Sequence, residues 1–202
     1  MQGSSILEQQ GVSASDATRV LEEALQGADD GELYLESVRS ESFGFDDGRL
    51  KTAAYDSGQG FGLRVVSGET TGYSHASEIS MAAIRRAAET AAQAKRGRNA
   101  VLSPPPALTN RRLYEPIDPT ASPDFAVKAG LMGEIDAWCR AADPRVVQVS
   151  VSLAGSSTEV EIVRAGGARL TEVRPLVRLN ISVTMEKDGR RETGSAGMGG
   201  RT

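Results

Sequence analysis

The spacing of apolar positions along the chain alternates between a helical period and a strand period. Residues 13–27 place apolar side chains at helical intervals, with Ser13 or Ser15 positioned to cap the start and Gly27 to end the helix. Residues 77–97 are rich in alanine and predict a second helix, whose first residue, a serine, is the expected cap. Strand-like sequence lies between these two segments, which indicates a mixed α+β chain.

A third helix is predicted over residues 122–143. Ser122 is the expected cap, and Pro123 suits the first turn because that position needs no amide donor. Cys139 lies on this helix among apolar neighbours and is therefore expected to be a core residue. The face expected to be buried carries four apolar side chains at helical spacing, Leu131, Ile135, Trp138 and Ala142.

Strand-like segments accompany these helices and end at two-residue turns. Residues 32–38 and 146–154 alternate apolar and polar side chains, as expected for strands with one buried face. Pairs of turn-forming residues then predict four antiparallel hairpins, because such pairs accept the positive φ angles of tight turns. Three of the turns are Asp47-Gly48, Gly166-Gly167 and Asp188-Gly189, and Ser67-Gly68 lies near the fourth.

A proline-rich segment divides the chain. Five of the eight prolines lie within residues 104–119, and helix and sheet interiors resist proline because it lacks the amide donor. We predict an N-terminal α+β domain at 1–97, a proline-rich connector at 98–122 and a second α+β unit at 123–202. The expected fold class is α+β, with two similar helix-plus-antiparallel-sheet units joined by the connector.

The two halves of the chain repeat the same order of elements. Residues 46–56 correspond to 165–175, and residues 60–73 correspond to 176–191, judged by the spacing of turns rather than by residue identity. A helix follows the last strand of the first half, whereas the second half stops at the glycine-rich "GSAGMGGRT". The repeat therefore predicts that the second unit is truncated at its C-terminal end. A stop codon directly after Thr202 in the native gene would contradict this prediction.

Composition and charge narrow the classes of function. Apolar residues make up 39% of the chain and charged residues 25%, which is ordinary for a globular protein. A net charge of −4 and an aromatic content of 4% do not indicate nucleic-acid binding. The charge is uneven, since residues 1–56 hold twelve acidic and four basic residues and residues 164–202 hold eight basic and four acidic ones. This asymmetry is typical of two solvated surfaces, or of an interaction between the ends or with a partner.

Cysteine content and hydropathy predict a cytoplasmic protein. A single cysteine excludes an intrachain disulfide and fits a reducing compartment. No stretch approaches the ~18 consecutive apolar residues of a membrane-spanning helix. The N-terminus has neither the basic start nor the apolar core of a secretory signal. We therefore expect no membrane association.

The glycine-rich "GQGFG" at residues 58–62 raises the possibility of a phosphate-binding loop, which its context excludes. A dinucleotide loop needs a helix directly after the glycines, so that the first amides of the helix face the pyrophosphate. Strand-like sequence follows here instead, and the Gly-Lys-Ser/Thr of a Walker loop is absent. We expect these glycines to let a helix, a neighbouring backbone or a ligand pack closely against a twisted strand.

The remaining candidates do not form a complete active site. His75 is the only histidine, no serine lies in a G-x-S-x-G elbow, and a surface position is the favoured interpretation. One histidine and one cysteine cannot form an ordinary zinc site without two carboxylates or an outside ligand. The acidic pairs lack the spacing of a calcium loop; these are Glu22-Glu23, Asp29-Asp30 and Asp46-Asp47. Four arginines on neighbouring strands could line a basic groove or face solvent singly, namely Arg164, Arg169, Arg174 and Arg178.

Two long stretches resemble a known family. Residues 34–80, "YLESVRS…SEIS", are similar to the N-terminal domain of the TldD/PmbA metalloprotease family, and residues 143–201, "DPRVV…GGR", are similar to the segment that follows. The most specific pieces are the glycine-rich run 59–68 and the run 173–182. The resemblance covers residues 15–202 and is closer to the TldD side of the family than to the PmbA side.

This resemblance implies zinc-dependent hydrolysis of unfolded or leader peptides, together with a PmbA/TldE-like partner subunit. The family's H-E-x-x-x-H metal motif and its late cysteine ligand have no counterpart in these 202 residues. No catalytic, metal or cofactor-binding residue is therefore assigned, zinc is expected only in the full-length protein, and this chain alone is expected to be inactive. It would then be the N-terminal scaffold and substrate-cleft portion of the protease. The alternative is a non-catalytic peptide-binding or subunit-assembly module.

Overall fold

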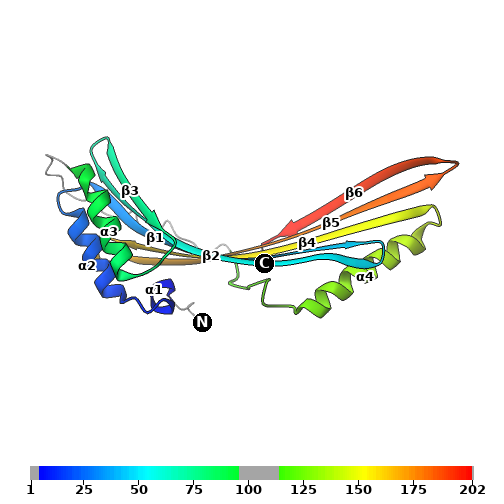
Figure 1. Ribbon diagram of the computed structural model, residues 1–202, viewed down its shortest axis with the longest axis horizontal. Helices are drawn as coiled ribbons and strands as arrows, with labels where there is room; N and C mark the ends of the chain where they lie inside the picture. The colour runs from blue at the N-terminus through cyan, green and yellow to red at the C-terminus, as the bar shows by residue number, and fades with distance from the viewer. Residues whose placement is uncertain (1–4, 96–113, 202) are drawn as a thin grey trace. The chain divides into compact units, whose positions relative to one another are not determined.

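The computed structural model describes residues 5–95 and 114–201, and its fold is α+β, as expected (Figure 1). One six-stranded antiparallel sheet has the strand order β3-β2-β1-β4-β5-β6. The first half of the chain contributes α1 (Ile6–Gln9), α2 (Ala14–Leu25), β1 (Asp30–Asp46), β2 (Arg49–Ser67), β3 (Thr70–Ala76), α3 (Met81–Ala91) and the short 3-10 helix η1 (Ala92–Lys95). The second half contributes α4 (Phe125–Ala142), β4 (Val146–Arg164), η2 (Ala165–Gly167), β5 (Arg169–Lys187) and β6 (Arg190–Gly200). No helix within the described ranges is both long and apolar enough to span a membrane.

The predicted hairpins are confirmed, and two of them close with the predicted two-residue turn. Asp47 and Gly48 connect β1 to β2 with φ angles of 47° and 71°, and Asp188 and Gly189 connect β5 to β6 with 52° and 78°. Two successive positive φ angles define the tight turn whose twist matches that of the flanking strands. The strands themselves are longer than expected, with 17 to 19 residues in β1, β2, β4 and β5. Segments that the sequence suggests as separate short strands are therefore parts of continuous ones.

The long strands change how the chain is grouped in space. It forms two compact units: unit 1 comprises residues 1–38, 58–113 and 158–173, and unit 2 comprises residues 39–57, 114–157 and 174–202. Both halves of the chain contribute to each unit, because β1, β2, β4 and β5 each supply residues to both. The division at 1–97, 98–122 and 123–202 stays a prediction about sequence modules. Much of its connector, residues 98–113, lies outside the described residues.

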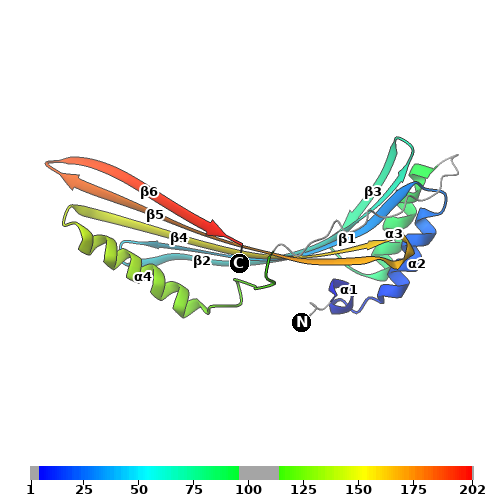
Figure 2. The same cartoon turned by 180° about the vertical axis from the view of Figure 1, so that it is seen from behind.

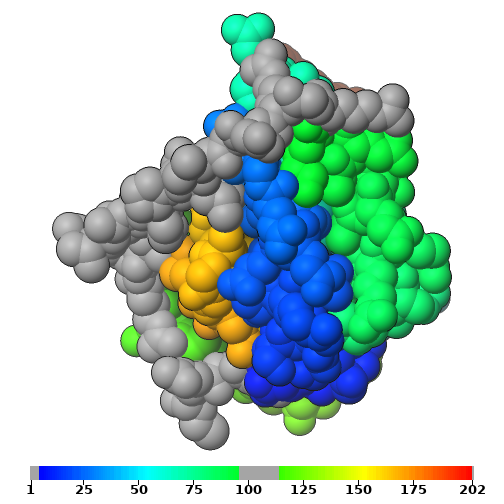
Figure 3. Space-filling model, turned by 90° about the vertical axis from the view of Figure 1, so that its left-hand side faces the viewer, coloured from blue at the N-terminus to red at the C-terminus, as the bar shows by residue number. Residues whose placement is uncertain are grey.

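Unit 1 has its core between the sheet and two helices. Alternate residues of the strands face α2 and α3, including Leu33 and Leu35 of β1 and Leu63 and Val65 of β2, and all four are fully buried. Figure 3 shows α2 in blue beside α3 in green. Ser13 caps α2, as predicted, by accepting a hydrogen bond from the Asp16 amide.

Close approach is confirmed at Gly60 and Gly62 of the glycine-rich run and occurs at Gly72 as well, whereas Gly58 has open space around it. A Cβ atom on Gly72 would collide with the carbonyl oxygen of Ala91 at the end of α3. A Cβ atom on Gly60 would meet the backbone of Ala76, and one on Gly62 would meet the ring of Tyr73. A helix, a backbone and an aromatic ring therefore occupy the space that side chains would need.

Unit 2 has its core between the sheet and α4. The buried residues of α4 are Lys128, Met132, Asp136 and Cys139. Met132 and Cys139 pack with Phe43 of β1 and with Val149, Val151 and Leu153 of β4. The core position expected for Cys139 is confirmed. The buried stripe predicted for this helix is wrong at three of its four positions, because Leu131 and Trp138 are 45% and 73% exposed and Ala142 is exposed, whereas Ile135 is partly buried against the core. The helix is rotated by about one residue, which places Met132 and Cys139 in the core.

Two predicted helix caps are also wrong. Ser80 rather than Ser77 caps α3, with its side chain accepting a hydrogen bond of 3.2 Å from the Ala83 amide. Asp124 rather than Ser122 caps α4, accepting from the Val127 amide at 3.0 Å. Each helix begins two or three residues later than the first serine suggests, because a second capping residue lies closer to the apolar run.

Candidate functional site

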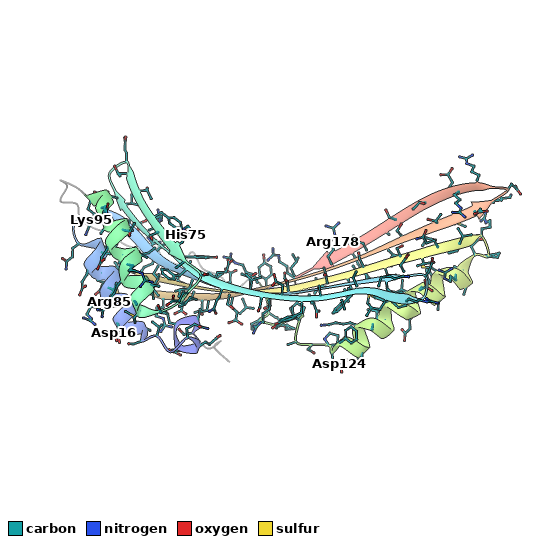
Figure 4. The ribbon with its side chains drawn as sticks, in the orientation of Figure 1. Asp16, His75, Arg85, Lys95, Asp124 and Arg178 are labelled. Carbon is teal, nitrogen blue, oxygen red and sulfur yellow. The ribbon has the colours of Figure 1, made fainter. Side chains whose placement is uncertain are left out.

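The sheet of unit 2 has one apolar face and one polar face. Odd-numbered residues of β1 and β4 face α4, and even-numbered residues face the other side because strand side chains alternate. The polar side is hollowed into a groove of about 680 Å³. Arg178 points away from α4 in Figure 4. The polar residues lining the groove are Asp46, Lys51, Ser150, Ser152, Arg178, Asn180, Ser182 and Ser195.

Asp46 is held at one end of the groove by two neighbours on β4. Ser150 Oγ donates a hydrogen bond of 2.6 Å to Asp46 Oδ1, and Gln148 donates one of 3.2 Å. These hydrogen bonds, with Ser150 contributing most, lower the pKa of Asp46 below its ordinary value because they stabilise the charged carboxylate. Asp46 is therefore a fixed acceptor at neutral pH and not a poised acid or base.

Arg178 and Asn180 form the other polar cluster of the groove. Arg178 Nε donates to Asn180 Oδ1 at 3.2 Å, and Asn180 Nδ2 donates to Ser152 Oγ at 3.4 Å. Gly197 of β6 lies opposite Asn180, where a Cβ atom would collide with the Asn180 amide oxygen. The groove therefore offers donors and acceptors without a nucleophile and base in contact, which suits binding rather than bond cleavage.

One wall of the groove belongs to β6, an edge strand of the sheet. β6 pairs only with β5 in the strand order, and all eleven of its residues are exposed. Its outer edge thus presents a row of backbone amides and carbonyls. The other edge strand, β3, lies in unit 1 together with the part of β2 that pairs with it.

The residues weighed as catalytic candidates lie apart from this groove. His75 is exposed on β3, and its ring stacks on Tyr73 with the centroids 5.6 Å apart. Its backbone partner is Gly62, so His75 lies on the sheet face opposite α2 and α3 (Figure 4). Cys139 is buried against the sheet in unit 2. Within the described residues, neither His75 nor Cys139 belongs to a group of three or more His, Cys, Asp or Glu side chains.

Of the four arginines that could line a basic groove, Arg178 lines the polar groove of unit 2, whereas Arg164 and Arg169 are held by acids on two different faces of unit 1. Arg164 contacts Asp30 and Glu32 on the face opposite the helices. Arg169 forms a 2.6 Å ion pair with Glu161, which is buried and accepts a 2.9 Å hydrogen bond from Ser5 Oγ. The acidic pairs also accept hydrogen bonds from residues distant in sequence: Asp29 from the Gly68 amide, Asp47 from Arg140 and Glu22 from the Gly166 amide.

The described residues do not fit a metal ion. No group of three or more His, Cys, Asp or Glu side chains lies close enough together in residues 5–95 and 114–201 to hold one. The remaining positions of the sequence contain none of these four residue types. We therefore derive no metal-dependent step from the residues of this chain.

Comparison with known proteins gives two matches to one family. The model of "PmbA/TldA metallopeptidase domain 1" matches residues 31–95, and the model of the "PmbA/TldA metallopeptidase central domain" matches residues 118–202. Together the two matches cover most of the chain.

Curated relatives point to the TldD side of the family. A protein described as "Metalloprotease TldD homolog" from Buchnera aphidicola subsp. Schizaphis graminum is 36% identical over 98% of this chain, and one from Haemophilus influenzae is 38% identical over 84%. This chain spans 41% and 36% of those two proteins.

Solved structures with the same fold come from more distant proteins. Two described as putative modulators of DNA gyrase, from Bacteroides thetaiotaomicron and Thermotoga maritima, each superpose with a TM-score of 0.69 at 15% identity. TldE from Thermococcus kodakarensis superposes with a TM-score of 0.64 at 12% identity. Each match covers at least 92% of this chain and 43–44% of the other.

Proposed function

Because the chain belongs to the PmbA/TldD metallopeptidase family, we propose that it forms the N-terminal scaffold and part of the substrate cleft of a TldD-like zinc metalloprotease. The full-length protein would hydrolyse unfolded or leader peptides in the cytoplasm, together with a PmbA/TldE-like partner subunit. The 36–38% identity to TldD homologues supports the protease, and the structural likeness to TldE supports a partner with the same fold.

The catalytic metal would be held outside these 202 residues. A bound zinc ion supplies a polarised carbonyl and an activated water in peptide hydrolysis. The residues described here contribute the binding surface, since their polar groove holds fixed donors and acceptors and no group of metal ligands.

The free edge of β6 is the observation that carries the peptide-binding role. An extended peptide can add to an exposed strand edge through main-chain hydrogen bonds, which impose little sequence preference. β6 offers eleven exposed residues for this purpose, and four glycines keep side chains off the strand. Alternate side chains of an added peptide would extend over the polar groove beside β6, within reach of Ser195 and Arg178.

Two neighbouring proline substitutions test this role in the full-length protein. Successive amides of an edge strand point alternately toward the neighbouring strand and toward solvent. Of the two variants Ser195→Pro and Ala196→Pro, one therefore removes an amide that points toward β5 and the other removes an amide that points toward solvent. The variant that loses the outward amide should raise KM for an unfolded peptide about fivefold, the equivalent of one hydrogen bond of ~1 kcal/mol.

Circular dichroism and the unfolding midpoint identify which proline variant keeps the β5–β6 pairing. An unchanged KM in that variant would contradict peptide addition at β6. A photoreactive unfolded peptide that labels no residue of 145–198 would contradict it as well.

A further inference from the structure

The exposed flank of α4 and the adjoining side of β5 and β6 form an apolar surface in unit 2, named the apolar trough below, with α4 as its wall. The position that a Cβ atom on Gly133 would take lies 3.7 Å from the Phe45 ring, and Arg140 pairs with Asp47. The side of α4 that carries Gly133 and Arg140 therefore faces β1. The opposite flank faces β4 and β5, which follow β1 in the sheet order. That flank carries Leu131, Ile135, Trp138 and Ala142, spaced by four, three and four residues.

The floor of the trough is the α4-facing side of β5 and β6. Odd-numbered residues of β5 face this side and are only partly buried, namely Val177, Leu179, Ile181 and Val183. Leu179 pairs with Met198 and Ile181 with Ala196, so these β6 residues face the same side. Met198 is 71% exposed. In Figures 1 and 2, α4 runs along β4, and β6 lies farther from α4 than β4 does.

This trough is apolar on both sides. Its wall and floor consist of aliphatic side chains, one methionine and Trp138, which is the only tryptophan in the sequence and is 73% exposed. A contiguous apolar surface of this kind marks a place where another element packs. A stripe at helical spacing beside a half-covered sheet is the complement of an amphipathic helix.

Unit 1 shows which element covers the matching position in the first half of the chain. There the order is α2, β1, β2, β3 and α3, and the last helix packs on the edge strand, with Gly72 of β3 against Ala91 of α3. The second half has α4, β4, β5 and β6 in the same order, with hairpin turns at corresponding places. The position corresponding to α3 is the trough over β5 and β6.

We propose that an amphipathic helix of the same polypeptide, contributed by the sequence that follows β6 in the longer family protein, packs into this trough. The curated relatives extend well beyond the part that this chain matches, which supplies the length required. A helix of about 18 residues measures roughly 27 Å, about the length of α4 with its 18 residues. The inference rests on family membership and the trough, and not on peptide hydrolysis.

The test places a photoreactive benzoyl-phenylalanine in the full-length protein, at Leu131 in one variant and at Met198 in another. These positions lie on the wall and the floor of the trough. Irradiation should give an intramolecular adduct in both variants, and peptide mass mapping should place it within the helical segment after residue 202. The same amino acid at Tyr55, which is 61% exposed on β2, should give no adduct with that segment.

Three outcomes overturn the proposal. Adducts that join two copies of the chain would make the trough a dimer interface. Adducts with a separate subunit would make it a partner site. The absence of any adduct from both trough positions, in a protein with an unchanged circular dichroism spectrum, would show that the trough stays open.

Discussion

Replacing Lys128 with methionine is expected to lower the free energy of unfolding by about 3–5 kcal/mol, the usual cost of removing one partner of a buried ion pair. Lys128 and Glu41 are 5% and 9% exposed. Lys128 Nζ lies 2.6 Å from Glu41 Oε1 and 2.7 Å from the carbonyl oxygen of Pro119. Without the ammonium group, the Glu41 carboxylate stays buried and loses the cation beside it. Urea unfolding followed by circular dichroism measures the change.

Two further variants separate the cost of an unpaired buried charge from a general loss of stability. Lys128→Met combined with Glu41→Leu removes both charges and should recover most of the loss, because apolar side chains replace a buried ion pair at little cost. Arg190→Met breaks an ion pair with Glu192 whose side chains are 82% and 68% exposed, and it should leave the unfolding midpoint unchanged. A Lys128→Met chain as stable as the original would contradict the buried pair.

Gly72→Val is expected to lower the free energy of unfolding by about 3 kcal/mol, at the upper end of the range for overpacked sites. Its Cβ atom would collide with the backbone oxygen of Ala91 and crowd Ala94, so α3 must move away from β3. The effect should appear in thermal and urea unfolding alike. It should also weaken the protection of α3 amides from hydrogen exchange, because that helix loses its contact with the sheet.

Gly194→Val is the matched control for this substitution. Gly194 also lies on an edge strand, and no atom lies within 4 Å of the position its Cβ would take. Valine favours strands over glycine, so this variant should be as stable as the original chain or slightly more so. Equal stability of the Gly72 and Gly194 variants would contradict the close contact between β3 and α3.

The hairpins could be predicted from sequence because their information is local. Asp47-Gly48 and Asp188-Gly189 determine the turn conformation by themselves, and the alternation beside each turn sets the face of every strand residue. The orientation of α4 could not be predicted in the same way. Lys128 and Asp136 are polar and indicate solvent, yet both are buried. Lys128 pairs with the distant Glu41 of β1, and Asp136 pairs with Arg140 of the same helix.

The candidate site, like the orientation of α4, depends on contacts between residues that are distant in sequence. Ser150, Ser152 and Asn180 alternate with apolar residues along their strands, which is the pattern of any solvent-facing side of a sheet. Only the order β1-β4-β5-β6 brings them to one groove. The stripe Leu131–Ala142 is apolar, as predicted, but Leu131, Trp138 and Ala142 are exposed and only Ile135 packs against the core.

The most direct test of the proposed scaffold role is to measure metal content and peptide hydrolysis in parallel on the 202-residue chain and on the full-length protein. The full-length protein should carry stoichiometric zinc and cleave an unfolded peptide, and both should disappear on treatment with a chelator. The 202-residue chain should keep its fold, carry no stoichiometric metal and leave the peptide intact. Stoichiometric zinc together with peptide cleavage by the 202-residue chain would contradict the assignment of this segment as a scaffold.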